Sequence, residues 1–88
     1  VLTSEDAIAA AAIKAAEDLK ISVPIIGFNN SNITEYTTPT ITSVDNMIDR
    51  LCDMAVNCLE SLENNKSVPS KTVISGRIVE RESFKSPL

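Results

Sequence analysis

Short apolar runs of the kind that form β-strands alternate with two amphipathic helical stretches along this chain. The apolar runs span residues 25–28, 41–44, 72–74 and 78–79, and the helical stretches span residues 4–19 and 45–64. Parallel strands need long connections, and a helix is the usual one. The alternation therefore predicts an α/β fold in which helices cover a parallel sheet.

The first helix has a start signal and an expected core face, and the second helix has an apolar stripe. Thr3 is the expected N-cap of the first helix, and Asp6 completes a capping-box arrangement. Ala10 and Ile13 fall within the polar face of that helix. The residues expected to face the core are Ile8, Ala12, Ala15, Ala16 and Leu19. The second helix has a continuous stripe of Met47, Ile48, Leu51, Cys52, Ala55, Cys58, Leu59 and Leu62.

The composition indicates a piece of a larger domain. The 88 residues allow at most one domain, and they include one Tyr, two Phe and no Trp. A chain this short buries only about 60–65% of its surface. This is a poor stock of core residues for an independent domain and a natural one for a fragment.

Charge and residue types exclude several functions. The net charge is −4 and the eight Lys and Arg are scattered, whereas a phosphate-binding surface needs clustered cations. With no His and no cysteine cluster, neither a metal site nor a cofactor is expected. There is no nucleophile beside a base and no glycine-rich phosphate loop, so no catalytic residue is expected either.

The two cysteines indicate a reducing compartment. Cys52 and Cys58 are six residues apart on one helix, which is about 9 Å of helical rise. A disulfide needs Cα atoms within roughly 7 Å, so the two cannot pair. Two free thiols and no apolar run long enough for a membrane span favour a cytoplasmic protein.

Four motifs resemble those of one family, in its order and at nearly its spacing. Residues 3–9 look like an Asn-Asp-x-x-Ala segment, and residues 23–30 look like Val-Pro … Val-Ile-Gly-Phe-Asp-Asp. Residues 39–44 look like Pro-Pro-Leu-Thr-Thr-Val, and residues 77–83 look like a closing Val-x-Arg-x-Ser. Together they resemble the C-terminal part of the effector-binding domain of lactose-repressor (LacI/GalR) family regulators, and the Asn-rich loop is similar to maltose-type repressors.

The resemblance implies a fragment of a two-lobed, periplasmic-binding-protein-like fold. Residues 1–44 and 77–88 would belong to the C-terminal lobe, and residues 45–76 to the N-terminal lobe. The lobes would close about hinges near Asn46 and Gly76. Gly76 suits a hinge because glycine absorbs backbone rotation without Cβ strain, although an ordinary turn would explain it equally well.

The resemblance also implies an effector site between the lobes, at the carboxyl ends of the strands. Asp6, Asn29 and Asn46 match positions that reach the ligand, and their carboxylate and amides suit a sugar. The alternatives are that Asp6 only stabilises the helix start, that Asn29 is a turn residue, and that Asn46 is a polar residue before a helix.

A homodimer is implied as well, with Ala10, Ile13 and Thr37 as contacts between the two copies. The alternative for Ala10 and Ile13 is a stray apolar pair on the surface. The expected function is a sugar-responsive part of a bacterial repressor, which contacts DNA only through a headpiece absent from this sequence. A secreted sugar-binding protein of the same fold is the alternative.

Overall fold

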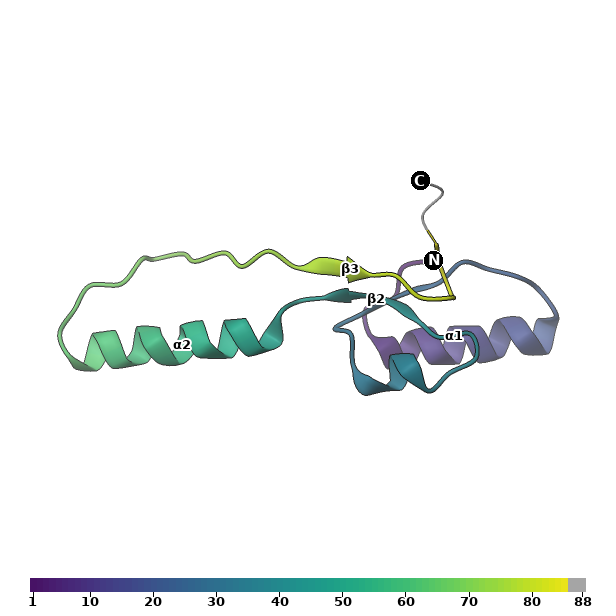
Figure 1. Cartoon of the computed structure of the whole chain (residues 1–88), viewed down its shortest axis with the longest axis horizontal. Helices are drawn as coiled ribbons and strands as arrows, with labels where there is room; N and C mark the ends of the chain where they lie inside the picture. The colour runs from purple at the N-terminus through teal and green to yellow at the C-terminus, as the bar shows by residue number, and fades with distance from the viewer. Residues whose placement is uncertain (86–88) are drawn as a thin grey trace.

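The computed structural model describes residues 1–85, so positions 86–88 of the predicted segment 77–88 lie outside the described residues. The elements follow in the order α1 (Asp6–Leu19), β1 (Ile26–Phe28), the 3-10 helix η1 (Asn32–Glu35), β2 (Thr42–Asp45), α2 (Ile48–Glu63) and β3 (Arg77–Val79). The predicted α/β class is confirmed (Figure 1).

The three strands form one mixed sheet with β2 in the middle. β1 runs parallel to β2, with Phe28 opposite Val44, whereas β3 runs antiparallel to β2, with Arg77 opposite Asp45. The sheet is therefore mixed: β1 and β2 are parallel, as predicted, and β3 is antiparallel to β2. After β2 the chain runs out along α2 and returns through residues 64–76, so β3 enters the sheet from the opposite direction (Figure 1).

The core lies between α1 and the starts of β1 and β2. It consists of Ala9, Ile13, Ile25 and Ile41, with Ala10, Ala12 and Val23 packed partly against it. The packed face of α1 is therefore rotated from the predicted one, since Ile8 and Leu19 are 48% and 70% exposed. The periodicity misplaced this face because alanines occur all round the helix and a buried carboxylate, Asp6, lies on the packed side.

The start of α1 also differs from the predicted capping box. Glu5 is the N-cap residue and makes no side-chain cap hydrogen bond. The Thr3 hydroxyl instead donates to the carbonyl oxygens of Glu5 and Ile26. Thr3 thus connects the start of the chain to β1, and Leu2 forms a parallel bridge to Ile26 beside it.

Residues 81–84 join the starts of β1 and β2. The backbone N–H of Ser83 donates to Thr40, and the Ser83 carbonyl accepts from Ile25. The Ser83 hydroxyl accepts from the N–H of Thr42 and donates to the carbonyl of Ile25. Segments more than 40 residues apart in the sequence are connected here.

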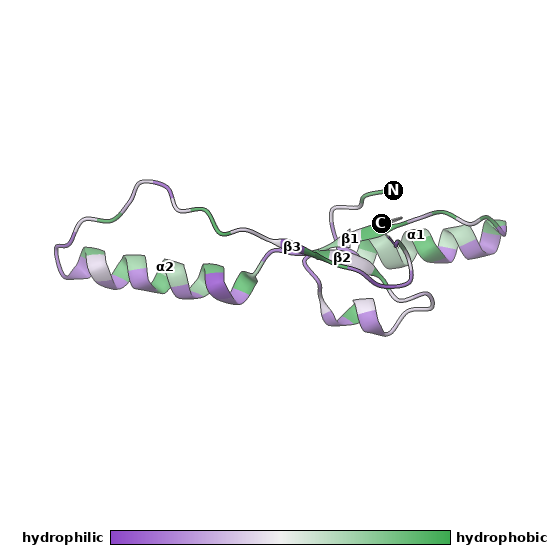
Figure 2. Ribbon diagram, turned by 45° about the horizontal axis from the view of Figure 1, so that its top comes forward, coloured by the Kyte–Doolittle hydropathy of each residue, from purple (hydrophilic) through white to green (hydrophobic). Residues whose placement is uncertain are grey.

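α2 projects away from this core and has no buried residue (Figures 1 and 2). Its large apolar side chains are all exposed; Leu51 and Leu59, for example, are 42% and 62% exposed. Residues 64–76 return without joining a strand, so the β run predicted at residues 72–74 is absent from the described structure. An apolar helix with nothing packed on it lacks the tertiary contacts that stabilise most helices.

The dimensions confirm that the chain is not compact. They are 59 × 26 × 18 Å, and the radius of gyration is 17.3 Å. A compact domain of 88 residues would have a radius of gyration of about 12 Å.

Candidate functional site

A polar hollow of about 470 Å³ lies where β2 leads into α2, and we call it the crossover hollow. It is lined by Asn29, Asn30, Asn32, Asp45, Met47, Ile48, Asp49, Arg50 and Arg77. These residues come from the carboxyl ends of β1 and β2, the start of η1, the start of α2 and the start of β3. Ligands of open α/β sheets bind at such carboxyl ends.

The chain turns sharply after β1, and this turn places two asparagines at the hollow. Asn29 and Asn30 have backbone φ angles of 93° and 53°, in the left-handed region that asparagine tolerates better than most residues. The Asn29 N–H donates to the carbonyl of Val44, and the Asn30 N–H donates to the hydroxyl of Ser43. Both amide side chains are thereby held at the end of the sheet.

The structure brings two of the three predicted effector-binding residues together. The side-chain amide of Asn46 donates to the Asn29 Oδ1 atom at 2.5 Å. Asn29 lines the crossover hollow, whereas Asn46 lies in the linker between β2 and α2.

Two carboxylates, Asp45 and Asp49, line the hollow, and Asp45 is the one at the end of β2. Its Oδ1 accepts from the backbone N–H of Met47 at 2.8 Å, and its Oδ2 accepts from the amide of Asn30 at 3.2 Å. These two hydrogen bonds, and to a smaller extent the positive charge of Arg77, hold the pKa of Asp45 below its usual range. The hollow therefore offers a carboxylate that stays ionised at neutral pH.

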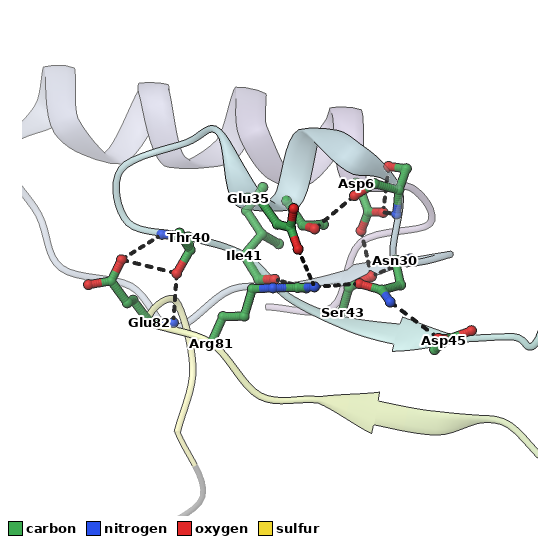
Figure 3. Close-up of polar contacts among 11 residues, drawn as sticks. Asp6, Asn30, Glu35, Thr40, Ile41, Ser43, Asp45, Arg81 and Glu82 are labelled. Atoms are coloured by element: carbon green, nitrogen blue, oxygen red, sulfur yellow. Dashed lines mark hydrogen bonds and ion pairs between the residues drawn. The ribbon is translucent and has the colours of Figure 1, made fainter.

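The third predicted residue, Asp6, is buried and 2% exposed. Its Oδ2 accepts from the N–H and the hydroxyl of Ser31, and its Oδ1 accepts from the hydroxyl of Ser43 (Figure 3). Asp6 thus connects the first turn of α1 to β2 and to the loop after β1. It also contributes to a second hollow of about 420 Å³, whose other lining residues are Glu5, Ala7, Phe28, Asn29, Ser31 and Ile33.

Gly27 allows α1 to approach β1 closely enough for these contacts. A Cβ atom at position 27 would lie 2.2 Å from Asp6 Oδ1 and 3.2 Å from the Ile41 side chain. Gly76 has a comparable steric role, since a Cβ there would lie 2.7 Å from the backbone oxygen of Asp45. Neither glycine has a positive φ angle, so the conformational freedom expected for Gly76 is not used in this state.

The three predicted dimer contacts have different environments. Ile13 is 8% exposed and belongs to the core, so the prediction that it lies on the polar face of α1 is wrong. Ala10 is half-buried against the same core, and Thr37 is half-buried in the loop before β2, where its hydroxyl donates to the carbonyl of Pro39. Ile13 therefore offers little surface to a second copy, and a contact through Ala10 or Thr37 stays a prediction.

Sequence reasoning missed Asn30, Asp45, Arg77 and Arg81. Asn30 follows a candidate residue directly and Asp45 ends a strand, so their positions after strands were an available signal. Arg81 contacts residues 40 and 51 positions away, and no local pattern indicates such contacts.

Within residues 1–85, no group of three His, Cys, Asp or Glu side chains is placed to hold a metal ion. Cys52 and Cys58 are both free thiols. Among the described helices, none has the length and apolar character needed to cross a bilayer.

Residues 1–84 match the model of the periplasmic binding protein-like domain. An HTH-type transcriptional regulator of Lachnoclostridium phytofermentans is 37% identical over 87 residues, which cover 94% of this chain. The chain spans only about a quarter (26%) of that relative's length.

Solved structures agree with this match. The transcription regulator CcpA of Lactococcus lactis superimposes with a TM-score of 0.85 at 34% identity, covering 96% of this chain and 33% of its own. A periplasmic binding protein/LacI transcriptional regulator from Alkaliphilus metalliredigens, complexed with D-xylulofuranose, superimposes with a TM-score of 0.83 at 28% identity. That match covers 97% of this chain and 34% of the other.

Proposed function

The chain belongs to the periplasmic binding protein-like domain family, as part of the effector-binding domain of a LacI/GalR-type regulator. We propose that it contributes half of a pocket for a small polyhydroxylated effector, which is expected to be a sugar. Its relatives are transcriptional regulators, which favours a regulatory role over that of a secreted solute-binding protein.

The crossover hollow is the observation that supports this proposal. Its volume of about 470 Å³ falls in the range typical of small-molecule sites. Asn29 and Asn30 supply amide groups that donate and accept, and Asp45 supplies an acceptor. This combination suits adjacent hydroxyl groups, and the similar Alkaliphilus metalliredigens protein was solved with a sugar.

In this proposal the hollow lies between two lobes. Residues 1–44 and 77–88 form one lobe, and residues 45–76 belong to the other. The exposed apolar side of α2 supports the division, because such a side needs a partner surface that residues 1–85 do not provide. The effector closes the lobes about the linkers at Asn46 and Gly76 and so shifts a two-state equilibrium.

The regulator acts as a homodimer that binds DNA through a headpiece outside this sequence. When the effector closes the two lobes, the spacing of the two headpieces changes. A DNA-binding regulator of this kind works in the cytoplasm, where the thiols of Cys52 and Cys58 stay reduced.

The test is a titration of monosaccharides and disaccharides into a polypeptide extended to the length of its relatives. Binding is measured by calorimetry. Replacing Asn29 by alanine removes amide contacts worth about 1–2 kcal/mol, so affinity is expected to fall about tenfold. The control is Asn57→Ala on the exposed surface of α2. Equal affinities of the two variants, or no binding of any sugar, would contradict the proposal.

A further inference from the structure

Arg81 follows β3 and reaches Asn30, a residue that lines the crossover hollow (Figure 3). Its Nη1 donates to the Ile41 carbonyl at 2.9 Å, and its Nη2 donates to Asn30 Oδ1 at 2.8 Å. The side chain is only 16% exposed, and the Glu35 Oε1 atom lies 4.0 Å from its Nη2. Arg81 is therefore held mainly by two neutral oxygens, one of which belongs to a residue that lines the hollow.

The neighbours of the Asn30 amide leave it one orientation. An arginine can only donate hydrogen bonds and an ionised carboxylate can only accept them. Asn30 lies between Arg81 and Asp45, so its oxygen must face the arginine and its nitrogen must face the carboxylate (Figure 3). A flipped amide would place nitrogen against guanidinium and oxygen against carboxylate, and both hydrogen bonds would be lost.

The hydrogen bonds that fix the Asn30 amide continue to the start of α2. Asp45 Oδ2 accepts from Asn30, while Oδ1 accepts from the N–H of Met47. Met47 is the N-cap residue of α2, with a backbone φ angle of 57°. A single connected path therefore runs from Arg81 through Asn30 and Asp45 to the first residue before α2.

We propose that Arg81 is a positioning residue for the crossover hollow: it fixes the orientation of the Asn30 amide, and through it the Asp45 carboxylate that an effector hydroxyl meets. The hollow then presents a fixed amide donor beside a fixed acceptor, which selects ligands whose neighbouring hydroxyl groups match that order. The role in ligand selection rests on the proposed function, whereas the orientation of the amide does not.

The first measurement follows Asp45 by NMR in the extended polypeptide without any ligand. The 13Cγ signal of Asp45, assigned with Asp45→Asn, gives its pKa in the wild type and in Arg81→Lys. Lysine keeps the charge, but a single ammonium group does not replace the arginine fork. A rise in the pKa of Asp45 toward its usual range is expected, because an amide that Arg81 no longer orients donates less steadily to the carboxylate.

The charged groups around Asp45 decide the choice of control. Arg77 lies opposite it on β3, and Asp49 and Arg50 of α2 line the same hollow; none of them changes in Arg81→Lys. Glu82→Gln is the matched control, because Glu82 lies next to Arg81 in sequence but bonds to Thr40, outside the hollow. This control is expected to leave the pKa of Asp45 unchanged.

Two further readings keep the proposal testable if Arg81→Lys does not fold. In the wild type, the two Nη atoms of Arg81 are expected to give separate signals, since both are hydrogen-bonded. In Asn30→Asp, which keeps an acceptor for Arg81, a second negative charge is expected to raise the pKa of Asp45. Averaged Nη signals, or an Asp45 pKa that neither Arg81→Lys nor Asn30→Asp changes, would overturn the proposal.

Sugar titrations separate this inference from the proposed function. If a sugar binds, Arg81→Lys is expected to weaken it at least several-fold while Glu82→Gln does not, and equal affinities overturn the role in selection. If no sugar binds the wild type, the proposed function fails, and the Asp45 and Arg81 signals still decide whether Arg81 orients the amide.

Discussion

At the scale of single residues, the buried carboxylate of Asp6 connects three segments of the chain: the start of α1, the loop after β1, and β2. It accepts three hydrogen bonds from Ser31 and Ser43 across 25 and 37 residues of sequence. The aspartate expected from the sequence to reach an effector is thus engaged within the chain itself. Its close packing also explains why position 27 is a glycine.

Asp6→Asn is expected to lower the free energy of unfolding of the extended polypeptide by about 1–3 kcal/mol. The amide keeps one acceptor oxygen, so a hydrogen bond from Ser31 or from the buried Ser43 hydroxyl is lost. Urea unfolding gives the difference.

The matched control is the same substitution at Asp18, whose ion pair with Lys14 is exposed on both sides. Such pairs contribute about 0–1 kcal/mol. Equal effects at positions 6 and 18 would show that Asp6 is not a structural connection.

The carboxylates of Glu82 and Asp45 predict how stability depends on pH. The N–H and hydroxyl of Thr40 hold the pKa of Glu82 below its usual range, and the pKa of Asp45 is lowered as well. A carboxylate with a lowered pKa contributes stability above its unfolded pKa, about 3.9 for Asp and 4.3 for Glu, and the contribution is lost as pH falls through the folded pKa.

The melting temperature of the extended polypeptide is therefore expected to fall between about pH 5 and pH 3. Glu82→Gln removes one of the two groups, so its melting curve series is expected to be flatter over that range. Differential scanning calorimetry checks this, and parallel pH profiles for both proteins would contradict it.

At the scale of the elements, α2 is apolar on a side that no described residue covers. We expect Leu59→Ala to leave the helicity of the isolated 88-residue polypeptide nearly unchanged, because none of residues 1–85 covers Leu59, which is 62% exposed. In the extended polypeptide, where the proposed second lobe would cover Leu59, the same change is expected to cost about 2–5 kcal/mol.

Circular dichroism on the short polypeptide and urea unfolding of the extended one give the two values. Leu19→Ala, at a 70% exposed position of α1, is the control in the extended polypeptide. A negligible cost at Leu59 there would contradict the assignment of α2 to a second lobe.

The helices and strands show which features of the fold a sequence pattern can predict. The apolar runs located β1 and β2 to within one residue, and the stripe located α2. The packed face of α1 was misjudged because alanine fills several faces equally and Asp6 was counted as polar. η1 was missed because Asn, Thr and Glu within a polar loop carry no periodic signal.

The candidate site was partly predictable for a related reason. Asn29 lies at the end of a strand, which is where an effector site was expected from the sequence. In the structure Asn29 accepts a hydrogen bond from Asn46. Arg81 acts across 51 residues on Asn30, and only folding brings the two together. Local patterns therefore identify residues at the ends of elements and miss those that orient them from a distance.

At the scale of the whole molecule, the core is too small for the chain. Only four apolar side chains are buried among the described residues, and two of them lie on α1. Their burial must offset a conformational entropy cost of about 1–2 kcal/mol for each ordered residue. We therefore expect a polypeptide of these 88 residues to show no cooperative thermal transition and little dispersion of its amide NMR signals.

The polypeptide extended to the length of its relatives is the control, and it is expected to melt cooperatively. A sharp transition of the short polypeptide, with coincident signals from circular dichroism and fluorescence of Tyr36, would show that the four-residue core is sufficient.

The position of Ser83 has a consequence for biosynthesis. Its hydroxyl and backbone join Ile25 to Thr42, so the starts of β1 and β2 lack these hydrogen bonds until residues 81–84 have been translated and have left the ribosome. Contacts over such sequence separations form slowly, because the intervening chain must first be brought together. Nascent chains of this region are therefore expected to expose unpaired strand edges throughout the synthesis of α2 and the segment after it, and such edges are prone to aggregation.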